Sequence, residues 1–165
     1  MAAPAIDKTD RFFAPEITKI VFCPDTVDFD KAAPTRAEID AGKELMNEVS
    51  AVNGFNVSSN MIDAPDYGSR FTSQTGGRTS VADSSLVFYQ SRDTHDVREI
   101  LPRGTKGFVL IMWGGDVADQ LMDVFPVEST SAGKSIPDNA DSDITVAFAI
   151  TSEPAEDVMI PAVGP

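Results

Sequence analysis

The chain has 165 residues, 42% of them hydrophobic, and a formal net charge of −13 at pH 7. This length and composition are those of one globular domain over residues 1–165 and exclude a globally disordered chain. The acidic surplus opposes binding to nucleic acid phosphates or an anionic membrane, and it is concentrated after Lys106, where Lys134 is the only basic residue.

The first part of the chain is predicted to contain an arm, a strand and a helical turn. Residues 1–10 are rich in Ala and Pro, as in an N-terminal arm that a monomer would leave frayed. A strand is expected over residues 17–23. The sequence Thr35-Arg36-Ala37-Glu38 has the spacing of a capping box, which predicts a helical turn beginning at Thr35.

Residues 45–61 are predicted to form one long strand. Apolar residues occupy the odd positions 45, 49, 51, 55, 57 and 61, with polar residues at most of the even positions between them, which is the period of a strand with one buried face. Asn53-Gly54 is a strong hairpin signal, but a two-residue turn there would pair apolar with polar side chains on each face. The apolar residues stand at odd positions both before and after Asn53-Gly54. We therefore favour a continuous strand with Gly54 as a weak point.

Residues 63–80 are predicted to form a long interaction loop. They are polar, contain glycine and show no clear period. Unstructured loops longer than about 12–15 residues are usually functional or disordered in compact domains. The aromatic residues Tyr67 and Phe71 lie near Arg70 and Arg78, a mixture that is enriched at protein interfaces. A merely mobile loop is the alternative.

The second half of the chain is predicted to be mainly strands. They are expected over residues 85–90, 107–113, 121–128 and 144–151, and in the last of these Ile144, Val146, Phe148 and Ile150 alternate with small residues. One short helix is expected over residues 94–101, with Thr94 as its cap. Gly114-Gly115 predicts a turn, and residues 153–165 are expected to form a C-terminal arm.

Two motifs suggest ligand sites but lack essential residues. Residues 131–135 resemble the end of a phosphate-binding loop, yet Glu128 stands where that loop needs Gly, so a turn between strands is favoured. The acidic run 138–143 resembles a calcium loop, but Ile144 and Ile150 replace its Gly and Glu. We expect this run to be a solvated loop.

The sequence carries no signature of catalysis. His95, the only histidine, is expected to be exposed at a helix end, and no nucleophile-elbow motif accompanies it. The single cysteine, Cys23, excludes an internal disulfide and a thiolate zinc site and fits a reducing cytoplasm. We therefore expect no enzyme and no catalytic, cofactor-binding or metal-binding residues. No apolar run has the length of a signal peptide or of a membrane-spanning helix, which predicts a soluble protein that is intracellular at synthesis.

The order of elements resembles that of the major tail (tail tube) protein of long-tailed bacteriophages over nearly the full length. The segments that carry the resemblance are SSLVFYQS, RGTKGFVLIMWGG, MDVFPVEST and ITVAFAITSEPAEDVMIPA, at residues 84–91, 103–115, 122–130 and 144–162. The resemblance implies a mainly β fold, with two antiparallel sheets forming a sandwich or small barrel, one flanking short α-helix, a long interaction loop and extended terminal arms.

The resemblance also implies a structural function. Subunits of this family form hexameric rings whose inner strands join into a continuous barrel, and the rings stack into the tail tube of the virion, through which DNA is ejected. The expected partners are other copies of the chain and the tape measure and tail terminator or tip proteins, after synthesis in the host bacterial cytoplasm. Residues 63–80 would reach a neighbouring subunit, with Arg70 and Arg78 docking on its acidic surface. Asp116, Asp119 and Asp123 are candidates for acids that line the lumen and keep DNA sliding.

Three alternatives belong to other classes. A ring-forming tube protein of a contractile injection system would share the tube architecture. A monomeric β-sandwich module that binds carbohydrate or peptide would remain a monomer. A hydrolase that uses scattered carboxylates would have a pocket containing an Asp or Glu of raised pKa.

Overall fold

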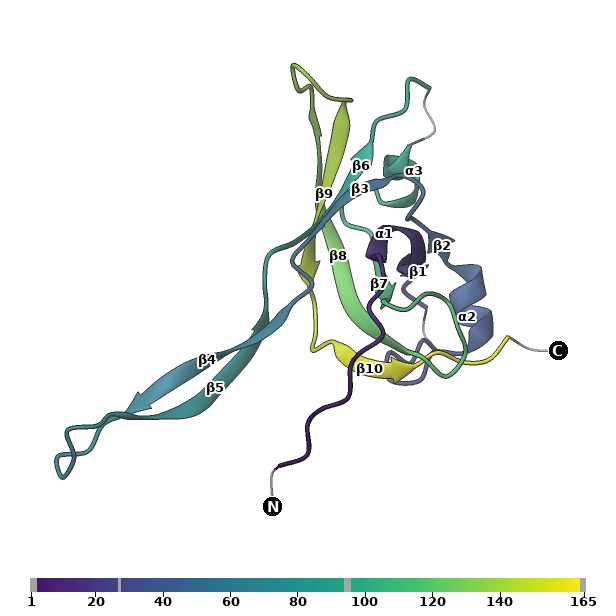
Figure 1. Cartoon of the computed structure of the whole chain (residues 1–165). Helices are drawn as coiled ribbons and strands as arrows, with labels where there is room; N and C mark the ends of the chain where they lie inside the picture. Colours follow the sequence, from purple (N-terminus) through teal and green to yellow (C-terminus); the bar gives the residue numbers. More distant parts are fainter. Residues whose placement is uncertain (1–2, 27, 94–95, 164–165) are drawn as a thin grey trace.

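The computed structural model describes residues 3–26, 28–93 and 96–163. Within them, two antiparallel sheets, of eight and two strands, are accompanied by three short helices (Figure 1). The helices are α1 (Ala14–Ile17), α2 (Arg36–Ala41) and α3 (Val97–Ile100). The strands are β1 (Lys19–Pro24), β2 (Lys43–Glu44), β3 (Val49–Asn53), β4 (Val57–Ala64), β5 (Ser73–Val81), β6 (Ser84–Tyr89), β7 (Lys106–Met112), β8 (Leu121–Ser135), β9 (Asp143–Ile150) and β10 (Ala155–Met159). The predicted mainly β fold with two antiparallel sheets is confirmed.

The larger sheet curls into a small barrel. Its strand order is β2-β1-β7-β8-β9-β6-β3, so β2 and β3 lie at opposite ends of the sheet. Only residues 45–48 separate these two strands in sequence, so the two ends of the sheet lie close together, although β2 and β3 do not pair among the described residues. Leu45 N donates to Ile20 O at 2.9 Å and Tyr89 N donates to Glu48 O at 3.0 Å, which fastens the link to both ends.

Side chains alternate between the two faces of each strand, and the inward-facing ones fill the barrel with one apolar core. Alternate residues of β1, β6, β7, β8 and β9 point inward and are almost completely buried. Their burial supplies the main stabilising free energy of the fold, at about 25 cal/mol for each Å² of apolar surface removed from water. The buried members of this cluster on those five strands are Ile20, Phe22, Leu86, Phe88, Val109, Ile111, Phe125, Val127, Ile144, Val146 and Phe148.

A second apolar cluster covers the outer face of β1, β7 and β8. Here α2 contributes Ile39, and the C-terminal segment contributes Val158 and Ile160. The segment is held because β10 pairs antiparallel with the start of β8. This corrects the expectation of a frayed arm over residues 153–165, since residues 155–160 complete a core. Residues 3–13, by contrast, are exposed and form neither helix nor strand.

The chain bends sharply between β3 and β4, so the predicted continuous strand over residues 45–61 is wrong. Gly54 and Phe55 both have positive φ angles, of 76° and 51°. The bend moves the chain from the barrel, where β3 pairs with β6, into the two-stranded sheet, where β4 pairs with β5. The alternation of apolar residues could not reveal this bend, because a change of chain direction leaves the odd-even pattern intact.

Burial of Phe55 stabilises the bend. Its ring is 5% exposed and packs against Phe125 with centroids 5.3 Å apart in an edge-to-face arrangement. A left-handed conformation costs a non-glycine residue roughly 1–2 kcal/mol, whereas burying a Phe side chain contributes roughly 1.5–3 kcal/mol. The buried hydroxyl of Ser84 adds two hydrogen bonds, accepting from Phe55 N at 2.9 Å and donating to Ala82 O at 2.8 Å.

Two further expectations are corrected in the strands. Residues 63–80 are not an unstructured loop, because β4 and β5 pair from Val57↔Val81 to Ala64↔Ser73 and leave only residues 65–72 as the tip. Residues 131–135 are not a turn but the end of β8, paired with β9 from Ser131↔Ala147 to Ser135↔Asp143. Polar and small side chains on both faces hid these strands from a search for apolar alternation.

The helix caps confirm one prediction and change another. At α2 both bonds of the capping box are present: Glu38 N donates to Thr35 Oγ1 at 3.4 Å, and Thr35 N donates to Glu38 Oε2 at 2.6 Å. At α3 the cap is Asp96, whose carboxylate accepts from Arg98 N at 2.9 Å. The predicted cap, Thr94, and the neighbouring His95 lie outside the described residues.

The bend predicts a large difference between two glycine substitutions. In Gly54→Ala the new Cβ would lie 2.3 Å from Asp83 O and 2.7 Å from Ser84 Cα, in addition to the positive φ. We expect this variant to lose at least about 2 kcal/mol of unfolding free energy in urea titrations. Gly76→Ala is the control: its Cβ meets nothing within 4 Å, and we expect a change within about 0.5 kcal/mol. Equal effects of the two substitutions would contradict the role of the bend.

Candidate assembly surface

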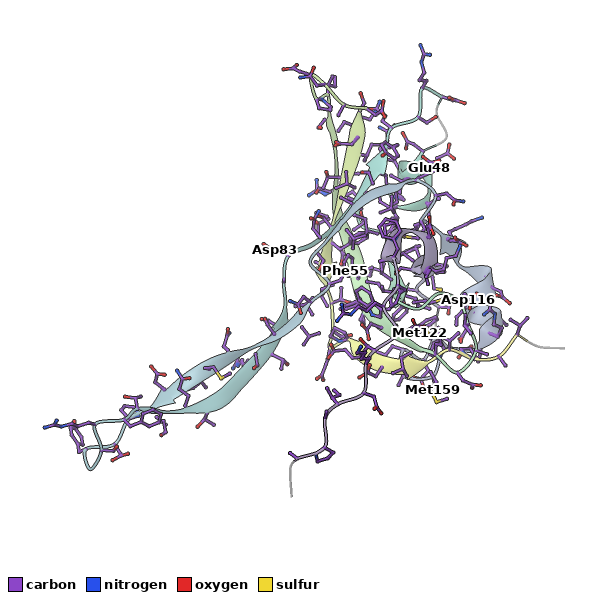
Figure 2. All side chains as sticks on the ribbon, viewed as in Figure 1. Glu48, Phe55, Asp83, Asp116, Met122 and Met159 are labelled. Carbon is purple, nitrogen blue, oxygen red and sulfur yellow. The ribbon has the colours of Figure 1, made fainter. Side chains whose placement is uncertain are left out.

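The β4–β5 hairpin projects away from the barrel as a separate arm (Figure 1). Figure 2 shows where it leaves the body, with Phe55 inside the barrel and Asp83 at the return of the chain. Along both strands nearly every residue is exposed, with Val57 and Val81 half-buried at the base. An isolated two-stranded hairpin is only marginally stable in water. A partner that covers this hairpin would therefore stabilise it.

Local hydrogen bonds shape the tip of the hairpin. Asp66 Oδ1 accepts from Gly68 N at 2.8 Å, and Ser69 Oγ accepts from Phe71 N at 3.0 Å. Side chains of Asp and Ser commonly form such turns with the backbone two residues further on. Ser73 Oγ closes the tip by donating to Ala64 O at 2.8 Å. The tip is thus built by its own short polar side chains and leaves its large side chains free.

Large apolar side chains on the hairpin face solvent. Tyr67 is fully exposed, Phe71 is 77% exposed and Met61 is 65% exposed. The structure therefore brings together Tyr67, Phe71 and Arg70, the tip residues that the sequence singled out, on residues 65–72. Arg78 lies on β5, closer to the body. Exposed apolar side chains grouped in this way are typical of an interaction surface.

The two arginines of the hairpin have no ion-pair partner within residues 3–26, 28–93 and 96–163. The two acids of the hairpin, by contrast, are both engaged. Asp63 Oδ1 accepts from Gln74 Nε2 at 2.8 Å, and Asp66 forms the turn described above. The hairpin therefore offers two guanidinium groups to a partner. Such groups can form bidentate hydrogen bonds with carboxylates.

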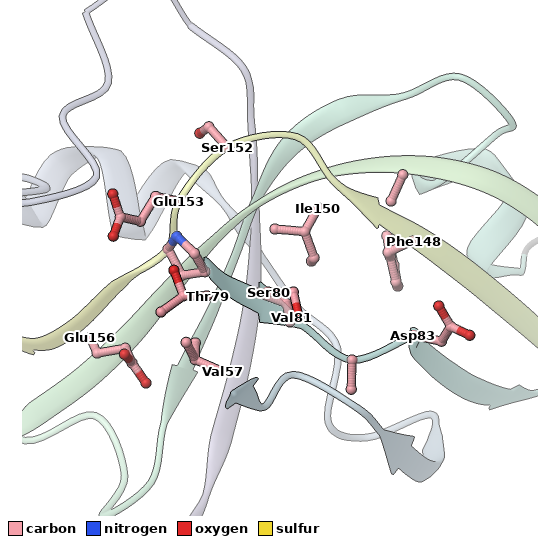
Figure 3. Close-up of a pocket in the computed structure, with 13 residues that line it drawn as sticks. Val57, Thr79, Ser80, Val81, Asp83, Phe148, Ile150, Ser152, Glu153 and Glu156 are labelled. Carbon is pink, nitrogen blue, oxygen red and sulfur yellow. The ribbon is translucent and has the colours of Figure 1, made fainter. Parts of the chain in front are cut away.

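A cleft of about 570 Å³ lies where the hairpin joins the body (Figure 3). Its walls come from the base of the hairpin, the end of β9 and the turn that leads into β10. Val57, Val81 and Ile150 contribute apolar surface. Asp83, Glu153 and Glu156 contribute carboxylates, and all three residues are exposed. The cleft thus combines an apolar floor with an acidic rim.

Two of the three acids proposed for a lumen have partners within the chain. Asp116 accepts a bidentate pair of hydrogen bonds from Arg36, at 2.6 and 2.7 Å, and Arg36 also bridges to Asp40. Asp123 accepts from Trp113 Nε1 at 2.7 Å and from Asp157 N at 3.0 Å. Asp119 is exposed, with a φ of 66°. Asp116 and Asp123 therefore have local structural roles, whichever surface they face.

The described residues present little that resembles an active centre. No group of three or more His, Cys, Asp or Glu side chains among them is placed to hold a metal ion. Burial, together with a smaller effect of the nearby Glu38 carboxylate, raises the pKa of the Cys23 thiol to about 11, so little of it is thiolate near neutral pH. Residues 138–142 of the acidic run form a loop that leads into β9, which begins at Asp143, and residues 138–141 are exposed. No described helix is long and apolar enough to cross a membrane.

Comparison with known proteins identifies the family. The model of a family described as phage tail tube protein matches residues 6–163. The chain belongs to the phage tail tube protein family. Membership gives it a structural role in a tail tube. No curated protein matches the sequence of this tail tube protein.

Three solved structures are similar to the tail tube protein at low sequence identity, and the first of them shares its fold. A chain of the 6-fold symmetrised anti-feeding prophage (AFP) baseplate, solved by cryo-EM, has a TM-score of 0.56 and 8% identity, covering 92% of this chain and 95% of that chain. A chain of the virion of a native gene transfer agent (GTA) particle has a TM-score of 0.48 and 14% identity, and the match covers 82% of this chain and 94% of that chain. A crystal structure of Hcp protein has a TM-score of 0.43 and 10% identity, and the match covers 81% of this chain and 88% of that chain.

The sequence of the tail tube protein carries a signal for the C-terminal strand segment but none for the cleft. Val158 and Ile160 alternate with polar or exposed residues, a short period-two pattern that marks the segment packed on the outer core. The cleft had no such signal. Asp83 is separated by 70 residues from Glu153 (153 − 83), and only the fold brings them to one rim.

The Arg36–Asp116 pair predicts a pH-dependent contribution to stability. Hydrogen bonds from Arg36 lower the pKa of Asp116 below its ordinary value of 3.8. The contribution is therefore complete above pH 3.8 and is lost as the pH falls toward the lowered folded-state pKa. Because the pair is partly exposed, we expect Asp116→Asn to lower the unfolding free energy at pH 7 by no more than about 1 kcal/mol.

Urea titrations of wild type and Asp116→Asn at neutral and acid pH test this expectation. The difference between the two proteins should shrink as Asp116 becomes protonated in the wild type. Asp138→Asn is the control, since Asp138 is exposed and has no hydrogen-bond or ion-pair partner among the described residues. A difference that persists unchanged at the lowest pH would contradict the electrostatic origin of the effect.

Proposed function

We propose that copies of this chain assemble head-to-tail into hexameric rings, and that the rings stack into the tail tube through which DNA is ejected. The observation that carries the proposal is the exposed β4–β5 hairpin, whose apolar and basic side chains have no partner surface within the described part of the chain. Family membership supports the same conclusion. A contact between two different surfaces of identical subunits generates rings or open polymers.

The sheet edges support assembly as well. β3 ends the strand order of the larger sheet and pairs only with β6 among the described residues, so one side of its backbone is open to another strand. Exposed edges are normally covered because they promote association. In a ring of identical subunits such edges serve as joints. The exposed arm of residues 3–13, with Ile6, Phe12 and Phe13, would become ordered on the neighbouring copy.

In this proposal the tube also contacts the tape measure protein and the tail terminator and tip proteins. Arg70 and Arg78 contribute to docking of the hairpin on the acidic surface of the next subunit. The tube of a contractile injection system is the second candidate, favoured by the shared fold with a chain of the anti-feeding prophage baseplate. A non-enzymatic role follows from either.

Removal of the exposed aromatic rings should block assembly. We expect wild-type protein to form rings or tubes in negative-stain microscopy, and Tyr67→Ser/Phe71→Ser to remain monomeric at the same concentration. Because both rings are exposed, the unfolding free energy of the double variant should stay within about 0.5 kcal/mol of wild type. The control is Ile136→Ser, which removes an equally exposed apolar side chain from the loop before β9 and should assemble normally. Wild-type protein that stays monomeric at high concentration would refute the proposed function.

Assembled protein should not retain duplex DNA. Tight binding would require lysine and arginine side chains that displace counterions from phosphates, and the chain has 13 basic against 26 acidic residues. We expect no shifted band in gel electrophoresis of DNA with tubes at about 0.15 M salt. A complex that weakens steeply as salt rises would show a basic lumen and would contradict the proposed sliding of DNA along an acidic wall.

A further inference from the structure

We propose that the cleft at the base of the hairpin is the receptor for the hairpin tip of a second copy of this chain. The inference rests on the proposed self-assembly and specifies the two surfaces that meet. The donor is the tip, with Tyr67, Arg70 and Phe71. The receptor is the cleft between the base of the hairpin and the turn that leads into β10 (Figure 3).

The geometry of the hairpin prevents the tip from filling its own cleft. β4 has eight residues, and a strand rises about 3.3 Å per residue, so the tip lies roughly 26 Å from the base. Val57 and Val81, which form the base, pair with each other and also line the cleft. The tip and the cleft therefore lie at opposite ends of the β4–β5 hairpin. The tip can reach such a cleft only on another molecule.

The charges of the two surfaces are complementary. Residues 57–81 contain two acids and two arginines, so the hairpin is neutral, and the rest of the chain carries the whole net charge of −13. Arg70 has no ion-pair partner among the described residues, whereas Asp66 is engaged in the turn of the tip. A second copy therefore attracts the hairpin more than it attracts any acidic surface of the body.

The rim of the cleft is free to receive a guanidinium group. Within the described residues, the carboxylates of Asp83, Glu153 and Glu156 accept no hydrogen bond and join no ion pair. Lys31 Nζ donates to the backbone carbonyl of Glu153 and leaves its carboxylate available. Arginine suits this role because its planar group binds carboxylates in a bidentate manner.

The apolar parts of the two surfaces also match. Val57, Val81 and Ile150 are half-buried and present aliphatic surface to the cleft. Tyr67 and Phe71 would lose most of their exposed area against this floor. Buried aromatic anchors with an arginine beside them dominate the binding free energy of many interfaces. The contact joins different surfaces on the two copies, so it is head-to-tail and propagates from copy to copy.

Charge exchange between tip and cleft tests the inference. Arg70→Glu and Glu153→Arg/Glu156→Arg should each raise the protein concentration required for assembly at least about tenfold, measured by sedimentation and negative-stain microscopy. The variant that combines all three substitutions should recover most of the loss, because the charges are again complementary. Circular dichroism and thermal unfolding confirm that each variant is folded.

Matched controls change the same number of charges elsewhere. Arg92→Glu and Asp138→Arg/Asp141→Arg alter exposed residues away from the cleft and should assemble like wild type. If wild type assembles and Glu153→Arg/Glu156→Arg assembles equally well, or if the combined variant is no better than Arg70→Glu alone, the cleft is not the receptor. That result leaves the proposed tube function intact. A wild type that never assembles overturns both.

Discussion

Burial of Phe55 in the barrel is the interaction on which the arrangement of the rest depends. The chain reaches that position only by adopting two consecutive left-handed conformations, and the second of them is strained for a non-glycine residue. Burial of the ring and the hydrogen bonds of Ser84 outweigh this strain. They fix the angle at which the chain leaves the barrel. The direction of the hairpin, and the place where the cleft forms beside it, both follow from this one buried side chain.

Charge is distributed unevenly between the hairpin and the body, as the proposed self-assembly around DNA would require. A uniformly acidic subunit would repel other copies as strongly as it repels DNA. Here the exposed hairpin is neutral and carries guanidinium groups, while the acidic surplus belongs to the body. In the proposed assembly this distribution favours one orientation of the two copies, and like charges oppose the others. The same surplus opposes tight binding of phosphates.

The fold class and most barrel strands could be predicted from the sequence, because alternation at positions such as Ile144, Val146 and Phe148 reports one buried face directly. The capping box of Thr35 and Glu38 was equally readable, since it depends on four consecutive residues. The bend at Gly54-Phe55 was not readable, because it depends on a pocket built by Phe125 and Phe148, far along the chain. β5 and the end of β4 were missed for another reason: neither face of the hairpin is buried, so no apolar period extends over these residues.

The candidate site was predictable only in part. The cluster of aromatic and basic residues at 67–71 indicated an interaction surface from local composition alone. The cleft had no local signature, because its acids come from segments that the topology brings together.

Separation of the hairpin from the core has a consequence for how such proteins diverge. Residues inside the barrel are constrained by close packing with many neighbours, so changes there must be compensated. Residues 65–72 are all exposed, so most of their side chains can change with little effect on the stability of the fold. Two lineages could therefore keep one barrel and alter only the tip and its receptor in step. Each would then assemble with its own kind and reject the other inside a cell that makes both.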